Sequence, residues 1–493
     1  MRRIDELPLN TYRCRPERVL QFGEGNFLRA FVDWMINRAN ASGAYQASVV
    51  VCQAIPTGLG TQINAQRGMY TLIMRGQENG EPVRQCEVIS SISRCINPYE
   101  DYEALLRVAE SPELEVVISN TTEAGIAYRA GDRLEDCPPA SYPAKLCALL
   151  YRRYQRFAGD PGRGLLVLPV ELIDENGNRL RELVLRYAAE WGLEETFSQW
   201  VKESNCFANT LVDRIVTGYP KEEAMAFEEL LGYEDRLMVA SEPYNLWVIE
   251  APPCWASRFP VGDGLANVIW TDCAAPYKKR KVRILNGSHT AVVPAAYLLG
   301  YETVADFLGD QAFVLLEHQL IFQEIIPSVD MPPEELVPFA RQVEERFRNP
   351  FITHYLADIQ LNSCSKFCAR CLPTILEYRE RVGEFPKRMV FGLAALIRYL
   401  RVEEQGNRYR GMRENGETYT VRDDAGVLEF FAGAWKHEEP RKVVEQVLAN
   451  RELWDGRNLT EIPGLTGLVV SYLEQMEQNG ISNTIKLLIK GGE

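Results

Sequence analysis

The segment from Arg18 to Ile36 constrains the fold most strongly, because it passes from a buried strand through a glycine turn into a helix. Arg18–Phe22 is a short apolar run, Gly23-Glu24-Gly25 follows it, and Ala30–Ile36 has apolar residues at helical spacing. In a Rossmann-type fold such glycines let backbone amides approach a pyrophosphate, and the helix N-terminus favours its charge. Because Leu28 replaces the third glycine of G-x-G-x-x-G, a strand-turn-helix without a ligand remains an alternative.

Further strands alternate with helices along the first half of the chain. We expect strands at Ala47–Gln53, Glu115–Asn120 and Leu165–Leu172, and helices at Tyr102–Glu110 and Ala144–Phe157. This alternation predicts an α/β domain with a doubly wound parallel sheet. An Asp or Glu at the end of the second strand would favour NAD, but Gln53 stands there, so this position alone leaves the cofactor open.

The second half of the chain predicts mainly helices. Helical periodicity, broken by Pro and Gly, marks Val304–Ile326, Pro333–Phe347, Ile352–Val382, Arg388–Val402, Val427–Trp435, Arg441–Asn450 and Gly467–Lys490. Two β-hairpins are also expected, one between Tyr70–Arg75 and Pro82–Ile89 and one around Asn415-Gly416. We therefore predict a Rossmann-type domain over residues 1–276 and a mainly α-helical domain over residues 277–493.

Composition and charge narrow the class of protein. The chain has 493 residues, 46% of them hydrophobic and 25% charged, which excludes disordered and fibrous classes. A formal net charge of −14 disfavours a general nucleic-acid binder. The N-terminus lacks the apolar core of a signal peptide, and no apolar run reaches the roughly 18 residues of a membrane span. We expect a cytoplasmic protein with reduced cysteines, either a monomer or a small homo-oligomer.

Lys281, Asn286 and His289 form the strongest catalytic candidate. In a regular helix at about 100° per residue, Asn286 would lie roughly 140° and His289 roughly 80° around the axis from Lys281. A lysine that removes a proton, beside an amide and an imidazole that hold an oxygen, suits acid/base chemistry on a hydroxyl. The alternative is a solvated basic face, because Tyr277–Arg283 is rich in Lys and Arg.

Several longer segments resemble one family along nearly the whole chain. They are Leu20–Trp34 with its Gly-Glu-Gly-Asn-Phe turn, Asn120–Ile126, Asn209–Pro220, Arg283–Thr290 and Leu361–Phe367. With them the chain resembles the polyol-specific long-chain dehydrogenase/reductase family, the mannitol dehydrogenase group. Within that family it is most similar to the members that interconvert tagaturonate and altronate.

The resemblance implies NAD-dependent, metal-independent hydride transfer between a secondary alcohol and a ketone. Lys281 matches the general acid/base of the family's K-x4-N-x2-H signature, Asn286 the oxyanion donor, and His289 the residue that orients the same oxygen. The role of Lys281 requires a pKa lowered towards neutrality, which burial and neighbouring cations would favour. The residues expected to contact the cofactor lie in the turns after the first, second and third strands: Phe22, Gly23, Gly25, Asn26, Phe27, Gln53, Asn120, Thr121, Thr122 and Glu123.

The implied substrate is a small sugar acid, so a cation must hold its carboxylate. Lys366 is the first candidate, Arg370 stands behind it, and Arg214 is a weaker choice. For each of them a surface ion pair is the alternative. Asp213 is expected to support the lysine or His289, or else to pair with Arg214.

One position departs from the family pattern. Mannitol dehydrogenases carry a second oxyanion-stabilising asparagine at the end of the strand that corresponds to Leu165–Leu172, and here Leu172 stands there. Either Asn286 acts alone, or another group such as Asn176 or Asn209 replaces the missing donor.

Other functions remain as alternatives. Fructuronate reductase and mannitol or polyol 2-dehydrogenase are alternatives within the family, and a non-catalytic NAD-binding regulator is one from another class. Cys364, Cys368 and Cys371 have the C-x3-C-x2-C spacing of an iron–sulfur site, but they fall in a predicted helical segment. We therefore predict no metal site. The net charge and the lack of a long apolar run predict no nucleic-acid or membrane partner.

Overall fold

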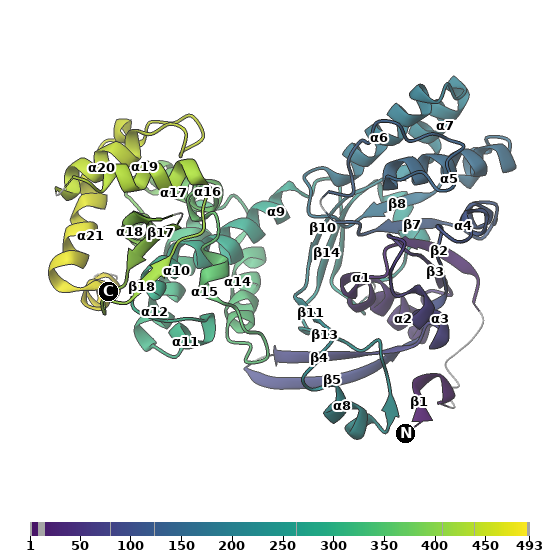
Figure 1. The fold of residues 1–493 in the computed structure, drawn as a ribbon, viewed down its shortest axis with the longest axis horizontal. Coiled ribbons are helices and arrows are strands. Elements are labelled where there is room, and N and C mark those ends of the chain that lie inside the picture. Colours follow the sequence, from purple (N-terminus) through teal and green to yellow (C-terminus); the bar gives the residue numbers. More distant parts are fainter. Residues whose placement is uncertain are drawn as a thin grey trace. The chain divides into compact units, whose positions relative to one another are not determined.

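The computed structural model describes residues 2–7, 15–78, 80–122, 124–262, 264–406, 408–437 and 439–490. The chain divides into two compact units, Met1–Ala274 and Ala275–Glu493. Each unit is described by itself below (Figure 1). No helix within the described ranges is long and apolar enough to cross a lipid bilayer.

A parallel sheet forms the centre of the first unit. Its strands lie in the order β6 (Ile92–Ile96), β3 (Ser48–Cys52), β2 (Glu17–Phe22), β7 (Val116–Ser119), β8 (Leu166–Pro169) and β9 (Cys206–Phe207). All neighbouring pairs are parallel. The predicted Rossmann-type sheet is thereby confirmed. The order reverses at β2, from which the chain moves first to β3 and later to β7, and ligands of such sheets bind at this switch point.

Both faces of this sheet are buried, which is why its strands read as continuous apolar runs. Val49 and Val51 of β3 face one side, whereas Val50 and Cys52 face the other. The first side packs against α1 (Asn26–Ala30), α2 (Val32–Ser42) and the smaller sheets of the unit. The second side packs against α4 (Tyr102–Ala109), α5 (Tyr142–Arg156), α6 (Asn176–Glu190) and α7 (Glu195–Ser204).

Smaller sheets and two further helices complete the first unit. The predicted hairpin is confirmed as β4 (Tyr70–Glu78) and β5 (Glu81–Ile89), which pair antiparallel. β4 also joins β13 (Val239–Ser241) and β11 (Val216–Gly218) in one sheet, while β10 (Asn209–Asp213), β14 (Leu246–Glu250) and β15 (Val268–Thr271) form another. The remaining elements are β1 (Arg2–Arg3), β12 (Tyr233–Glu234), α3 (Gly60–Ala65) and α8 (Ala224–Leu231).

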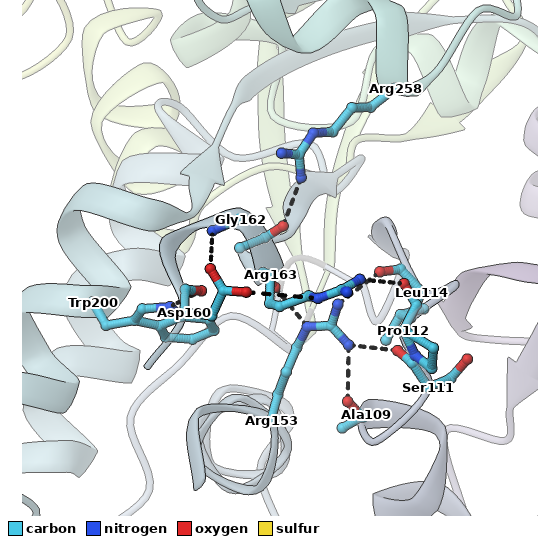
Figure 2. Close-up of polar contacts among 11 residues, drawn as sticks. Ala109, Ser111, Pro112, Leu114, Arg153, Asp160, Gly162, Arg163, Trp200 and Arg258 are labelled. Atoms are coloured by element: carbon cyan, nitrogen blue, oxygen red, sulfur yellow. Dashed lines mark hydrogen bonds and ion pairs between the residues drawn. The ribbon is translucent and has the colours of Figure 1, made fainter. Parts of the chain in front are cut away.

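A buried arginine holds together the loops that lead into β7 and β8. The guanidinium of Arg153, on α5, donates to the backbone carbonyls of Ala109, Ser111, Leu114 and Arg163 at 2.7–2.9 Å (Figure 2). Burial and the neighbouring arginines lower the pKa of Arg153 to about 10. These loops lie at the amino end of the strands, so the anchor leaves the carboxyl end, where the glycine turn lies, available for a ligand.

The second unit is mainly helical, as predicted. Its core helix is α10 (Ser288–Leu298), whose residues are all buried, as expected for a helix that is apolar on every side. Around it lie α9 (Ala275–Lys281), α11 (Val304–Leu308), α12 (Gln311–Gln319), α13 (Ile326–Ser328), α14 (Pro333–Phe347), α15 (Leu356–Ile359), α16 (Ser363–Arg370), α17 (Leu372–Val382), α18 (Lys387–Tyr399), α19 (Ala425–Ala434), α20 (Pro440–Ala449), α21 (Leu465–Asn479) and α22 (Ile481–Lys490). A small sheet of β16 (Val402–Gln405), β17 (Arg408–Met412) and β18 (Thr418–Thr420) contains the hairpin predicted around Gly416.

Some predicted boundaries were wrong. The segment Ile352–Val382 is not one helix, because Asn362 adopts a left-handed conformation with φ of 54° and separates α15 from α16. The strand predicted over Leu165–Leu172 ends at Pro169, so Leu172 lies beyond the sheet with 66% of its surface exposed. Apolar residues continue beyond Pro169 and on both sides of Asn362, so hydrophobic periodicity alone does not locate these two boundaries.

Candidate functional site

The three catalytic candidates lie on one continuous helical stretch that contains a π-turn. Lys281 is the last residue of α9, Asn286 lies in the π-helix η4 (Val282–Gly287), and His289 is the second residue of α10. A second π-helix, η5 (Leu320–Ile325), contacts η4. Short π-helical segments of this kind occur frequently at functional sites.

The π-turn changes which face of the helix each candidate occupies. The regular helix assumed from the sequence puts Asn286 roughly 140° away from Lys281. The expected regular helix does not form over Val282–Gly287, where the π-helix turns more widely. At about 80° per residue through this segment and about 100° per residue after it, Asn286 would lie roughly 50° from Lys281 on one side and His289 roughly 30° on the other. Such a turn favours a shared face for the three side chains.

Side-chain donors satisfy four successive carbonyls of the turn. The hydroxyl of Ser288 donates to the carbonyls of Ile284 and Leu285 at 2.7 and 3.3 Å. The hydroxyl of Thr290 donates to the carbonyl of Asn286 at 2.7 Å. The thiol of Cys371 donates to the carbonyl of Gly287 at 3.3 Å. Hydroxyls that bond back to the helix carbonyls often accompany distorted helices, and these donors hold the π-turn in place.

Gly287 allows another helix to approach this turn. A Cβ atom at Gly287 would lie 3.3 Å from the backbone oxygen of Arg370, the last residue of α16. The Arg370 guanidinium donates to the hydroxyl of Thr290 at 3.3 Å. Arg370 therefore contacts the turn through its side chain, and its backbone lies close to Gly287.

The basic run before the turn is largely engaged by neighbouring helices of the same unit. Glu377, on α17, forms ion pairs with Lys279 and Arg283 at 2.9 Å each. The guanidinium of Arg280 lies over the ring of Phe339, 4.4 Å from its centroid. Arg280 and Arg283 are both buried, so this part of the run is not the solvated face considered above.

His289 is buried and neutral at ordinary pH. Its ring stacks on Phe347 with 3.6 Å between centroids. Burial, together with the charges of His354, Arg346 and Arg370, lowers the pKa of His289 to about 3. Among the described residues its Nε2 atom has no hydrogen-bond partner. The ring is therefore suited to exchange a hydrogen bond with a ligand without carrying charge.

The asparagines that were candidates for oxyanion donation differ in what they bind. The Asn176 amide donates to the carbonyls of Pro169 and Glu171, and its oxygen accepts from the N–H groups of Gly177 and Thr210. The Asn209 amide likewise donates to Glu250 and accepts from Asn178. Both therefore hold loops of the first unit together. The Asn286 carboxamide, by contrast, forms no hydrogen bond with any described residue.

The predicted substrate-binding residues lie in different surroundings. Lys366, on α16, donates from Nζ to the carbonyl of Ile359 at 2.9 Å, and burial with the nearby Arg370 lowers the pKa of Lys366. Asp213 is buried at the end of β10 in the first unit. Arg214 donates to the carbonyls of Glu242 and Ala30. Arg214 is buried rather than part of a surface ion pair.

In the first unit, the glycine turn follows β2 as predicted. Gly23 has φ of 115°, and a Cβ atom there would lie only 2.9 Å from the backbone oxygen of Asn120. A Cβ atom at Gly25 would meet nothing within 4 Å, so the backbone at the start of α1 is open to a ligand. Phe22 is buried beside this turn, and Phe27 stacks on Phe31 with 5.1 Å between centroids. Asn26 accepts a hydrogen bond from Arg29 at 2.7 Å.

Gln53 shapes the loop after β3. Its amide nitrogen donates to the carbonyls of Ile55 and Pro56 at 2.7 and 3.1 Å, and its oxygen accepts from the Gly60 N–H at 3.1 Å. Glu24, inside the glycine turn, accepts from the Ala54 N–H at 3.0 Å and so joins this loop to the turn. The carboxamide of Gln53 is thus occupied by its own loop.

The loop after β7 is anchored by a buried carboxylate. Glu171 accepts hydrogen bonds from the N–H and the hydroxyl of Thr121, both at 2.9 Å, and from the Ser119 hydroxyl at 3.1 Å. Burial raises the pKa of Glu171. Thr122 adopts a left-handed conformation with φ of 70°, and the predicted cofactor contact Glu123 lies outside the described residues.

A cavity of about 280 Å³ opens at the carboxyl end of the parallel strands. Its wall includes Phe22 at the end of β2, Gln53 directly after β3 and Thr121 shortly after β7. Lys145 and Arg129 also line it and supply positive charge. An apolar and basic cavity beside the glycine turn fits part of a dinucleotide.

Sequence reasoning missed the residues that support the candidates. Ser288, Thr290 and Cys371 supply donors to the π-turn, Phe347 packs on His289, and Glu171 holds Thr121. Ser and Thr directly after Asn286-Gly287 were an available signal, because their hydroxyls bond back to the carbonyl four residues earlier. Cys371, Phe347 and Glu171 are distant in sequence from their partners and had no local signal.

Comparisons with known proteins agree with this architecture. Residues 17–261 match the model of the mannitol dehydrogenase Rossmann domain, and residues 274–477 match that of the mannitol dehydrogenase C-terminal domain. Altronate oxidoreductase of Escherichia coli O139:H28 is 44% identical over 479 residues, which cover 96% of this chain and 97% of the relative.

Two solved structures show a similar fold. One is Pseudomonas fluorescens mannitol 2-dehydrogenase in a ternary complex with NAD and D-mannitol, at 24% identity and a TM-score of 0.66, covering 97% of this chain and 96% of that one. The other is D-sorbitol dehydrogenase in substrate-free form, at 20% identity and a TM-score of 0.78, with the same coverage of both chains. The family resemblance found in the sequence is confirmed, and the chain belongs to the mannitol dehydrogenase family.

Proposed function

We propose that the chain is a tagaturonate reductase, an altronate oxidoreductase that uses NAD. The identity of 44% with altronate oxidoreductase over nearly the full length of both proteins supports this substrate pair. The glycine turn and the cavity at the carboxyl end of the strands support a nicotinamide dinucleotide. When bound, NADH would supply the hydride in the reduction, and NAD⁺ would accept it in the oxidation.

The observation that carries the proposal is the π-turn between Lys281 and His289, because its wider rotation favours a shared face for Lys281, Asn286 and His289. In the oxidation of the secondary alcohol, the Nζ atom of Lys281 takes the proton of the hydroxyl group, while the hydride leaves the carbon that carries this hydroxyl. In the reduction, the same ammonium returns the proton to the oxygen. Each direction therefore uses one protonation state of one lysine.

Asn286 and His289 hold the reacting oxygen in this proposal. The Asn286 carboxamide is without a partner among the described residues, so its N–H groups can donate to the oxygen as negative charge develops. The neutral His289 ring, fixed against Phe347, offers its Nε2 atom to the same oxygen or to an adjacent hydroxyl. Because Asn176 and Asn209 are engaged elsewhere, we propose that Asn286 acts as the single amide donor.

The substrate's carboxylate requires a cation. We propose that Lys366 binds it, because the other donors of its ammonium remain available beside the bond to Ile359. Arg370 donates a hydrogen bond to Thr290 and is the second candidate for the carboxylate ligand. Asp213 is proposed as a supporting acid. As a metabolic enzyme of this kind, the protein would act in the cytoplasm, as a monomer or a small homo-oligomer.

The decisive experiment follows NADH absorbance with tagaturonate, fructuronate and fructose at equal concentrations. The proposal predicts the highest kcat/KM for tagaturonate. A higher value for fructuronate would assign the other uronate epimer, and a comparable value for fructose would reject a carboxylate-dependent site.

A further inference from the structure

A separate cavity of about 440 Å³ lies in the second unit. Its wall comes from the ends of α10 and α18, the β17–β18 hairpin, the segment after α19, and the junction of α21 with α22. Three arginines line it: Arg398, Arg401 and Arg413. Cavities of this size hold small organic molecules.

The cavity is distinct from the candidate catalytic residues. Its α10 residue is Leu298 at the C-terminal end of the helix, whereas His289 lies at the N-terminal end. Nine residues at about 1.5 Å each separate the two positions by roughly 14 Å along the axis. None of Lys281, Asn286, His289 and Lys366 lines this cavity.

The charges in this cavity are only partly compensated. Arg401 pairs with Glu477 at 3.3 Å, and Arg413 pairs with Glu302 at 2.5 Å and with Glu417 at 3.4 Å. Glu414 accepts the backbone N–H of Ile481 at 2.9 Å and thereby caps the start of α22. The acidic groups of the wall thus have partners of their own.

Arg398 differs from the other two arginines of the wall. Its side chain is half-buried, and it forms neither an ion pair nor a hydrogen bond with any of the described residues. Arg413, by contrast, pairs with two carboxylates, Glu302 and Glu417. Arg401 pairs with Glu477, and half of its side chain is exposed. A partly buried guanidinium beside another arginine is costly unless an anion accompanies it.

The apolar part of the wall indicates the rest of the ligand. Met412, Trp435 and Met476 line the cavity together with the arginines. We propose that this cavity binds a small organic oxyanion, whose carboxylate or phosphate group is held by Arg398 and Arg401 while its carbon skeleton lies against Trp435. Arginine suits such groups because its planar fork donates two parallel hydrogen bonds.

The test measures thermal unfolding of the full chain, saturated with NADH, against increasing inorganic phosphate or citrate at constant ionic strength. A specific site produces a saturable rise in Tm, by several degrees once the anion exceeds its Kd about 100-fold. We expect this rise in the wild type, and we expect Arg398→Gln to weaken binding about tenfold or more. A response to citrate alone assigns a carboxylate ligand, and a response to both anions assigns a general oxyanion site.

Arg441→Gln is the matched control, because Arg441 is an exposed arginine on α20 whose only ion pair is with Glu445 among the described residues. It should respond as the wild type does. Phosphate also stabilises proteins without binding, and that rise is not saturable and is equal in every variant. If Arg398→Gln responds as the wild type does, or if no response saturates, the proposal is wrong. Should Arg398→Gln fail to fold, the more exposed Arg401→Gln serves as the test variant, with the same two outcomes.

Discussion

The hydroxyl of Thr290 donates to the backbone carbonyl of Asn286 at 2.7 Å, and it accepts from the guanidinium of Arg370 at 3.3 Å. This single side chain therefore joins the π-turn that carries Asn286 to the end of α16. The arrangement makes the position of the proposed oxyanion donor dependent on a residue that does not itself take part in the reaction.

Removing this hydroxyl should cost both stability and turnover. We expect Thr290→Val, which keeps the shape of the side chain, to lower the free energy of unfolding by about 1–2 kcal/mol, because it removes the hydrogen bonds to the Asn286 carbonyl and from the Arg370 guanidinium. Urea denaturation measures this loss, and kcat should fall with it. Thr290→Ser retains the hydroxyl and should stay close to the wild type, so equal losses in both variants would contradict this explanation.

A methyl group at Gly287 should disturb the turn. The added Cβ would lie 3.3 Å from the Arg370 oxygen and 3.4 Å from the Val282 oxygen, and both are backbone atoms that move little. We expect Gly287→Ala to destabilise the protein by about 1 kcal/mol or more. Gly433→Ala is the matched control on α19, where nothing lies within 4 Å, and it should stabilise by about 0.5–1 kcal/mol. A stabilising Gly287→Ala would show that α16 is not held against the turn.

Lys281 should be essential for turnover. We expect Lys281→Met to lower kcat by about 10²–10⁴-fold, the usual contribution of a general acid or base, with less effect on NADH binding. Lys279→Met tests a lysine on the same helix, which pairs with Glu377. Steady-state kinetics that show equal losses for the two variants would indicate a structural role for the basic run instead of catalysis by Lys281.

His289 should make the protein sensitive to acid. Its pKa is about 3 in the folded state, against about 6.5 for an unperturbed histidine, so the unfolded state binds more protons between these two values. Stability attributable to His289 is complete above pH 6.5 and falls by about 1.4 kcal/mol per pH unit as the pH drops towards 3. His289→Phe, which keeps a ring against Phe347, should lose this component of the pH dependence.

The comparison uses urea denaturation between pH 7 and pH 4.5. His437→Phe is the control, because His437 is exposed and its ring hydrogen-bonds to the neutral Gln446. Its stability curve should run parallel to that of the wild type. A His289→Phe curve that also runs parallel to the wild type would mean that His289 is not held neutral by burial.

Lys366 should affect uronate binding more than catalysis. If its ammonium binds the carboxylate, Lys366→Ala should raise KM for tagaturonate by about 10–100-fold, as loss of a charge-assisted hydrogen bond implies, with a smaller change in kcat. Lys442→Ala removes an exposed lysine that pairs with Glu439 and should leave KM unchanged. An unchanged KM in Lys366→Ala would exclude Lys366 as the carboxylate ligand.

Much of the first unit was predictable, because the patterns that indicate its strands and its glycine turn lie in neighbouring residues. Runs such as Val49–Val51 are apolar at every position, which indicates a strand buried on both faces, and Gly23-Glu24-Gly25 marks the turn after the first strand. The alternation of strands with helices indicates that the strands are parallel, whereas their order in the sheet is set by the tertiary structure. The helical segment expected from Ile352 was less predictable, because the left-handed conformation of Asn362 has no periodic signal.

The candidate site was only partly predictable for a different reason. The residue types and their spacing at Lys281, Asn286 and His289 are present in the sequence, but the angles between them depend on the helix type. The π-turn at Val282–Gly287 is accompanied by donors from Ser288, Thr290 and the distant Cys371, which bond to its carbonyls. Leu172, expected at the end of a strand, lies beyond it, because the strand ends at Pro169.

The sequence by itself determined the class of fold, the family and the residue types of the site, since hydrophobic periodicity, glycine positions and segment similarity are properties of neighbouring residues. Tertiary structure alone decided that a π-turn lies between Lys281 and His289, that Phe347 packs on a buried, neutral His289, and that Asn176 and Asn209 are occupied by backbone groups and a carboxylate. These outcomes depend on hydrogen bonds and packing between segments far apart in the chain, where the balance of buried donors and acceptors selects one local geometry over another.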